Sequence, residues 1–118
     1  MTQRDPRVYL DDILDALTGI QDIVSAISFE QFENNWMRRR AVERGLEIIS
    51  EASRRLPEDL KARHPDIPWR SIASVGNILR HEYGHVNPKI IWDITQRHLV
   101  ALKAAVDALI ATLDSSEN

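Results

Sequence analysis

Apolar residues recur at intervals of three and four along most of the chain, which is the spacing of one face of an α-helix. The first such stripe runs from residue 10 to residue 27 and predicts an amphipathic helix of about 20 residues. Asp5 and Pro6 are typical of a helix start and place its beginning. Ser28 followed by Gln31 forms a capping-box pattern, which predicts a second, short helix carrying two phenylalanines.

A longer stripe, through Val42, Leu46, Ile49 and Leu56, predicts a long helix that follows a bend near residues 34 and 35 and ends at Pro57. The segment from 57 to 68 is predicted to be a loop with one helical turn at residues 58 to 62. Its prolines lack an amide proton and restrict the residue before them, so no continuous helix can cross it.

The next stretch, WRSIASVGNILRHEYGHV at residues 69 to 86, separates apolar from polar side chains when it is turned into a helix. Asp66 is predicted to be its N-cap, Pro68 to lie in its first turn, and Gly84 to end it. One arc is suited to packing and consists of Trp69, Ile72, Val75, Gly76, Leu79, Tyr83 and Val86. The other face presents polar groups, namely Arg70, Ser74, Asn77, Arg80 and His81.

After Asn87 and Pro88, a last apolar stripe predicts one long helix that runs to a frayed tail at residues 115 to 118. The stripe passes through Ile91, Ile94, His98 or Leu99, Leu102, Ala105 or Val106, Leu109 and Leu113. No segment alternates apolar and polar residues with the period of a strand. We therefore predict an all-α fold, an up-and-down bundle of four main helices plus short ones, built by residues 1 to 118 as a single domain.

The composition limits the chemistry and the cellular location that are expected for this bundle. There is no cysteine, which excludes disulfides and thiolate chemistry, and no apolar run long enough to cross a membrane. The start of the chain lacks the hydrophobic core of a signal peptide, so a cytoplasmic protein is expected. The net charge of -3 is unevenly spread, because residues 35 to 70 carry nine basic and six acidic side chains. The cluster Arg38, Arg39 and Arg40 is either a solvated face or a basic surface for RNA.

Four amphipathic helices in a chain of 118 residues leave an apolar strip that the bundle cannot cover by itself. A homodimer with twofold symmetry is the simplest way to bury that strip. Gly76, in the middle of the packing arc, is suited to the close approach of another backbone, either from a second subunit or from the same one.

The polar face of the helix predicted at residues 69 to 84 carries the groups needed to cleave RNA without a metal. His81 can take or give a proton near neutral pH, and the guanidinium of Arg80 can hold a phosphate. Asn77 falls one turn before His81 on nearly the same line of the helix. Arg70 is too far along the helix to join them, except from a second subunit. The same face is also compatible with an ordinary solvated surface.

These residues also fit the H-E-x-x-H pattern of zinc hydrolases, in which His81 and His85 would bind the metal and Glu82 would act as the base. The helix is predicted to end at the second histidine, which disturbs the required spacing of one helical turn. The sequence offers no evident third ligand. We therefore predict no bound metal and no cofactor.

Several matching runs occur in the order that is found in one known family. The residues that match are Tyr9-Leu10, Asp12-Ile13-Leu14, Ala41-Val42-Glu43-Arg44, Leu46-Glu47-Ile48-Ile49, Glu51-Ala52, His64-Pro65-Asp66-Ile67-Pro68-Trp69, Asn77-Ile78-Leu79, His81-Glu82-Tyr83, Val86 and Trp92-Asp93. With them the chain resembles the HepT-like toxins of the HEPN superfamily over nearly its whole length. The part of the match that is most specific for this family is the Pro-Asp-Ile-Pro-Trp run followed by Asn, His-x-Tyr and Trp-Asp.

The resemblance implies a helical homodimer with a composite site at its interface and a metal-independent endoribonuclease activity. It also implies a bacterial type II or type VII-like toxin–antitoxin system, in which a minimal nucleotidyltransferase (MNT) antitoxin attaches AMP to Tyr83. In the family's motif a histidine and an arginine carry RNA cleavage. His81 matches the histidine, whereas Gly76 stands where the arginine usually is. Either Arg80 takes over phosphate binding, assisted by Asn77, or this chain keeps only the dimer and its partner surface.

Tyr83 can also be interpreted as a packing residue, because an ideal helix places it on the packing arc, where tyrosines are usually half-buried. If AMP is attached there, it adds a bulky anion beside His81, where an RNA phosphate has to sit. Four other polar or aromatic residues are interpreted as structural. Glu51 is interpreted as a polar group on a helix face and His64 as a loop residue. His85 is interpreted as a helix-end residue and Trp92 as a core anchor.

Overall fold

The computed structural model describes residues 5–81 and 87–116, and most of them are helical. The helices are α1 (Pro6–Val24), α2 (Phe29–Glu33), α3 (Trp36–Arg55), α4 (Glu58–Lys61), α5 (Trp69–His81), α6 (Pro88–Arg97) and α7 (Leu99–Ser116). The described residues contain no strand, so the prediction of an all-α fold is confirmed. Within these two ranges, none of the helices combines the length and the apolar composition that a bilayer crossing requires.

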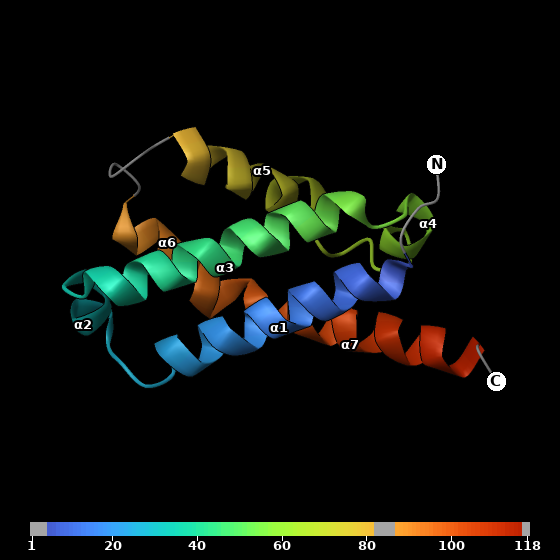
Figure 1. Ribbon diagram of the computed structural model, residues 1–118, viewed down its shortest axis with the longest axis horizontal. Helices are drawn as coiled ribbons and strands as arrows, with labels where there is room; N and C mark the ends of the chain where they lie inside the picture. Colours follow the sequence, from blue (N-terminus) through green and yellow to red (C-terminus); the bar gives the residue numbers. More distant parts are fainter. Residues whose placement is uncertain (1–4, 82–86, 117–118) are drawn as a thin grey trace.

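The long helices run up and down beside one another (Figure 1). α3 crosses the middle of the bundle and packs against both α1 and α5, and α7 returns along α1. α2 and α6 pack together at the end of the bundle where α3 begins. The predicted up-and-down bundle of four main helices is therefore confirmed, with α6 and α7 together taking the place of the fourth.

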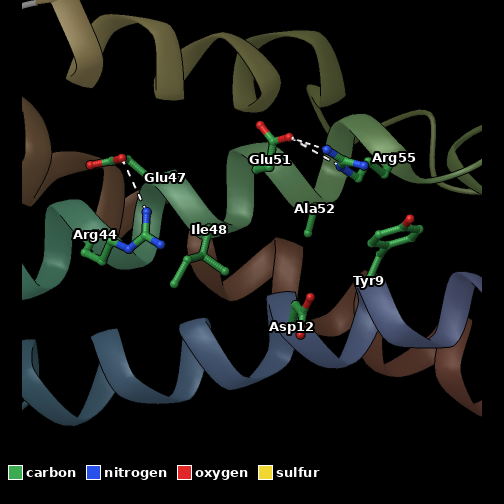
Figure 2. Close-up of a pocket in the computed structure, with 8 residues that line it drawn as sticks. All are labelled: Tyr9, Asp12, Arg44, Glu47, Ile48, Glu51, Ala52 and Arg55. Atoms are coloured by element: carbon green, nitrogen blue, oxygen red, sulfur yellow. Dashed lines mark hydrogen bonds and ion pairs between the residues drawn. The ribbon is translucent and has the colours of Figure 1, made fainter. Parts of the chain in front are cut away.

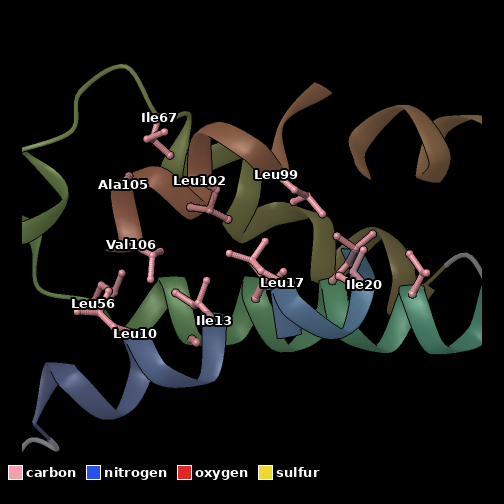
Figure 3. Packing of buried hydrophobic residues seen from close by; sticks show 14 of the residues in the cluster. Leu10, Ile13, Leu17, Ile20, Leu56, Ile67, Leu99, Leu102, Ala105 and Val106 are labelled. Carbon is pink, nitrogen blue, oxygen red and sulfur yellow. The ribbon is translucent and has the colours of Figure 1, made fainter. Parts of the chain in front are cut away.

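The core is one cluster of buried aliphatic side chains, joined by Phe32 from α2. Figure 3 shows the side chains of α1 facing those of α7 within this cluster. The most deeply buried aliphatic members are Leu10, Ile13, Ile20, Val42, Ile49, Leu102, Val106 and Leu109. These positions belong to the apolar stripes of the sequence, so helical periodicity correctly predicted the core.

Local capping signals set the helix starts as predicted. Asp5 accepts a hydrogen bond from the Arg7 amide (2.9 Å), and Pro6 opens α1. The Ser28 hydroxyl accepts from the Gln31 amide (3.2 Å), and the Gln31 side chain accepts from the Ser28 amide (2.9 Å). The predicted capping box is therefore present. Each cap provides a partner for amide groups that a helix start leaves unpaired.

The start of α5 differs from the prediction. Asp66 lies in a turn and is not the N-cap, because α5 begins only at Trp69. The indole N–H of Trp69 donates to the carbonyls of Lys61 and His64, both at 3.1 Å. These bonds tie the preceding loop to the first residue of the helix, so a tertiary contact anchors this end of α5. The predicted helix end near Gly84 lies outside the described residues.

The last stretch forms two helices, so the prediction of a single long helix is wrong. α6 and α7 are separated at His98, whose φ of -109° and ψ of -26° depart from the values of a regular helix. The buried Thr95 hydroxyl donates to the Trp92 carbonyl (2.7 Å), and back-bonding of this kind bends helices. The bend lets α6 pack on α2, where Trp92 contacts the rings of Phe29 and Phe32, while α7 packs on α1. Trp92 is a core anchor, as predicted.

Two glycines provide a matched test of how closely α1 and α3 approach each other. A Cβ atom added at Gly45 of α3 would lie 2.8 Å from Cγ1 and Cδ1 of Ile20, whereas one added at Gly19 would meet nothing within 4 Å. We expect Gly45→Ala to lower the free energy of unfolding by about 1–2 kcal/mol, because overpacking outweighs the gain in helix propensity. Gly19→Ala should raise it by about 0.5–1 kcal/mol. Urea denaturation followed by circular dichroism measures both, and equal stabilisation of the two variants would contradict the close approach.

Candidate functional site

α5 carries predicted site residues, and its position is fixed by a polar contact with α3. The hydroxyl of Ser50, which is 2% exposed, donates to the Ala73 carbonyl (2.7 Å) and accepts from the Gly76 amide (3.1 Å). The guanidinium of Arg54 donates to the same Ala73 carbonyl (2.8 Å). Buried hydrogen bonds of this kind favour one relative position of the two helices, because a shift would leave a buried polar group with neither a protein partner nor water. The register of α5 on α3 is therefore set immediately before Asn77.

The predicted site residues lie at the end of this anchored helix. Asn77 is exposed, as expected for the polar face, and Arg80 and His81 close α5. His81 lies about 7.5 Å along the helix beyond Gly76, the residue that contacts α3. Tyr83 lies outside the described residues, so its role stays a prediction.

The contact with α3 accounts for the glycine in the packing arc. Gly76 is buried, and the residue that its amide meets is Ser50 of the same chain. The structure therefore contains the packing within one subunit that was one of the two predicted explanations. At the position where the resembled family usually has its arginine, this chain has a contact between two helices. A phosphate bound at α5 needs a cation from another position.

Charged pairs on α3 lie at the level of the C-terminal half of α5 along the bundle, and the sequence analysis did not connect them with the site. The two helices are antiparallel (Figure 1), so earlier residues of α3 lie beside later residues of α5. Arg40 forms an ion pair with Glu43 at 2.9 Å. Arg44 pairs with Glu47 at 3.6 Å, and in both pairs the arginine is the more exposed partner. The spacing of the pairs is visible in the sequence, whereas their nearness to the end of α5 depends on helix packing.

A groove of about 610 Å³ lies between α1 and α3 (Figure 2). Its lining consists of Tyr9, Asp12, Arg44, Glu47, Ile48, Glu51, Ala52 and Arg55. Glu51 forms an ion pair with Arg55 at 3.0 Å, and hydrogen bonds from this guanidinium to Glu51 and then to Tyr9 raise the pKa of Arg55 above its ordinary value. The groove contains three carboxylates and two arginines, so its net charge is not positive and it is poorly suited to a polyanion. Glu51 is a helix-face polar group, as predicted.

The zinc hypothesis depends on residues that the structure does not describe. Glu82 and His85 of the H-E-x-x-H pattern lie between α5 and α6, outside the described ranges. Among the residues that are described, no group of three or more His, Cys, Asp or Glu side chains could hold a metal ion. The hypothesis therefore stands on the sequence pattern alone.

The chain is similar to proteins of one family. Residues 13–109 match the HepT-like family, whose description is ribonuclease HepT-like. A protein of Thermococcus cleftensis named probable ribonuclease HepT is 36% identical over 107 residues, which cover 91% of this chain and 97% of the relative. A protein of Methanocaldococcus jannaschii named as a candidate RNase is 35% identical over 107 residues, or 91% of this chain and 98% of the relative. No solved structure is significantly similar to the chain.

The anchoring role of Ser50 can be tested against a serine on the outside of α5. Ser50→Ala removes the bonds to Ala73 and Gly76, so we expect the free energy of unfolding to fall by about 1–3 kcal/mol. Ser74 is exposed and bonds only within its own helix, to the Ser71 carbonyl, so Ser74→Ala should change stability by about 0.5 kcal/mol or less. Hydrogen exchange should quicken for the amides of α5 more than for those of α1. Uniform quickening, or equal losses in the two variants, would argue against a specific anchor.

Proposed function

Because this chain belongs to the HepT-like ribonuclease family, we propose that it is an endoribonuclease toxin of a toxin–antitoxin pair. The family match spans residues 13–109 and so includes the whole of α5. The observation that carries the proposal is His81 at the end of α5, in a helix whose register on α3 is fixed by Ser50. A histidine on a rigid, anchored element is suited to moving protons during phosphodiester cleavage.

The proposed reaction needs a proton carrier and an anion binder but no metal. His81 takes the proton of an RNA 2′-hydroxyl as its oxygen attacks the neighbouring phosphorus. The bond from phosphorus to the 5′-oxygen breaks, that oxygen takes the proton held by the imidazolium of His81, and the products are a 2′,3′-cyclic phosphate and a 5′-hydroxyl. Arg80 binds the negative charge on the phosphate, and the amide of Asn77 donates to it. In this scheme Arg80 replaces the arginine that the family usually has at the position of Gly76.

A homodimer is part of the proposal, because α5 and its neighbours expose apolar side chains. Ile78 follows Asn77 on α5 and is 54% exposed, and Ile90 near the start of α6 is 57% exposed. Burying such side chains against a second copy is favourable, and twofold dimers are the commonest assembly of this kind. A dimer through this face would bring two α5 helices together and form one composite site.

The proposed antitoxin is an MNT-type nucleotidyltransferase that transfers AMP from ATP to the hydroxyl of Tyr83 and releases pyrophosphate. The modified residue stands two positions after His81 in the sequence. An added phosphate carries negative charge and bulk, so it competes with the RNA phosphate for the same cations. Modification would therefore block the nuclease without unfolding it.

A second candidate function has one observation in its favour. Gly76 is buried in a contact with α3 at the position where an arginine is usual, so the chain lacks the family's usual phosphate binder. If Arg80 does not replace it, the chain is a degenerate dimer that binds a nucleotidyltransferase without cutting RNA. Cleavage assays on the variants below separate the two functions.

We expect His81→Ala to lower the rate of RNA cleavage by about 10²–10⁴-fold, because the proton carrier is lost. Arg80→Gln should lower it by about 10²-fold, because the charge on the phosphate loses its partner. The matched control is Arg63→Gln, since Arg63 is exposed and lies before α5, at the opposite end from His81. Cleavage of labelled RNA with mapping of the new ends gives the rates and identifies the cyclic phosphate.

Three outcomes would contradict the nuclease proposal in different ways. If the wild type and His81→Ala are equally inactive, the degenerate binding protein is favoured. If Arg80→Gln cleaves as fast as Arg63→Gln, the arginine has been assigned wrongly. If the purified protein contains stoichiometric zinc that is lost in His85→Ala, the metal hypothesis replaces the proposed mechanism.

We expect Tyr83→Phe to retain RNA cleavage within a few-fold of the wild type, because the phenol has no part in the proposed reaction. The same variant should accept no AMP from the nucleotidyltransferase and ATP, since the hydroxyl that would form the ester is missing. Mass spectrometry detects the adduct, and a growth assay with the antitoxin reports its effect. An AMP adduct of unchanged stoichiometry on Tyr83→Phe would show that another residue is modified.

A further inference from the structure

Two large apolar side chains are exposed where α3 begins. Trp36 is 61% exposed and Met37 is 74% exposed. The side chain of Asn35 caps this helix start by accepting a hydrogen bond from the Arg38 amide (2.9 Å). The indole is therefore carried by a well-formed first turn. An exposed aromatic ring on a rigid element is suited to stacking on another flat ring.

The surface around Trp36 is basic in a chain that is acidic overall. Residues 36 to 47 contain four arginines and two glutamates, whereas α1 contains one arginine and four aspartates. The net charge of the whole chain is -3. Positive charge is thus concentrated on the first half of α3, which favours a polyanionic ligand at this place.

Arg40 connects the exposed ring with the charged surface. Its guanidinium carbon lies 5.6 Å from the centre of the Trp36 ring, and its Nη1 donates to Glu43 at 2.9 Å. A guanidinium has five N–H donors, so these contacts engage only part of its capacity. The Arg40 side chain is 46% exposed. Its remaining donors are available to a phosphate that arrives beside the indole.

The surface continues in Arg44, one helical turn further along α3 and 71% exposed. The contact between Ser50 and Gly76 relates this position to α5. Arg44 lies about 9 Å from that contact along α3, and His81 lies about 7.5 Å from it along α5 in the same direction. Arg44 and His81 therefore stand at nearly the same height on neighbouring helices.

We propose that Trp36, Arg40 and Arg44, together called the α3 track, bind single-stranded RNA. Trp36 stacks on a base, and the two arginines bind backbone phosphates at intervals of about 6 Å of helix rise. The inference rests on the proposed RNA-cleaving function and names the surface that holds the strand beside His81. The excess of positive charge in residues 36 to 47, beside an exposed indole, favours RNA, because RNA combines an anionic backbone with flat bases that stack.

The test separates binding from cleavage by using His81→Ala protein and a fluorescent, unstructured oligoribonucleotide of about 12 nucleotides. In this background, Trp36→Ala is expected to weaken RNA binding roughly 5- to 100-fold, which corresponds to the loss of one base–aromatic stack. Fluorescence anisotropy measures the affinity. Trp36→Phe should keep most of the affinity because it keeps a ring. Met37→Ala is the matched control, since its side chain is adjacent and even more exposed but cannot stack in this way.

The arginines are tested by the salt dependence of binding. Each phosphate contact to a single strand contributes about 0.7 to the slope of log K against log salt concentration. Arg40→Gln and Arg44→Gln should each reduce the slope by about that amount, whereas Arg63→Gln should leave it unchanged. An unchanged slope in both variants would remove the arginines from the α3 track.

Other results would overturn the inference as a whole. One is that Trp36→Ala binds the oligoribonucleotide as tightly as the His81→Ala parent does. Another is that Met37→Ala loses as much affinity as Trp36→Ala. Conversion of a dimer into a monomer by Trp36→Ala, seen by light scattering, would make this surface a protein contact instead. If the wild type cleaves RNA while Trp36→Ala binds normally, only the inference fails. If the wild type does not cleave RNA but His81→Ala binds it through Trp36, only the proposed function fails.

Discussion

The structure depends on α3, because two helices of the bundle pack against it through contacts of different kinds. The contact with α1 is apolar and close, since Gly45 leaves room for the side chain of Ile20. The contact with α5 is polar and directional, since Ser50 bonds to the backbone at Ala73 and Gly76. Apolar burial supplies most of the stabilisation, but it tolerates sliding, whereas the hydrogen bonds define one register.

The position of the proposed site follows from this arrangement. A helix that is held at its middle carries its last turn to a fixed place, and His81 lies in the last turn of α5. The ion pairs of Arg40 with Glu43 and of Arg44 with Glu47 lie on α3 at about the level of that turn along the bundle. The aspartates of α1 belong to the neighbouring helix, and one of them, Asp12, lines the same groove as Arg44.

Most of the fold was predictable because its signals are local. Asp5 and Ser28 cap helices through side chains that reach their own next turn, and the apolar stripes coincide with the buried positions. The bend at His98 was not predictable, because it accompanies the packing of α6 on α2 and of α7 on α1. The start of α5 was also missed, since the indole of Trp69 bonds to a preceding loop whose path the local pattern does not specify.

For the candidate site, the sequence by itself determined which reactive residue types share one helix, because residue type and spacing are properties of the chain. It identified His81, Arg80 and Asn77 on the polar face and the motif that ends at Tyr83. Only the tertiary structure decided that Gly76 is committed to packing on α3 and that the arginine-rich half of α3 lies at the level of the end of α5. These facts join residues that are more than 20 positions apart, and their proximity depends on how whole helices pack, which no local pattern specifies.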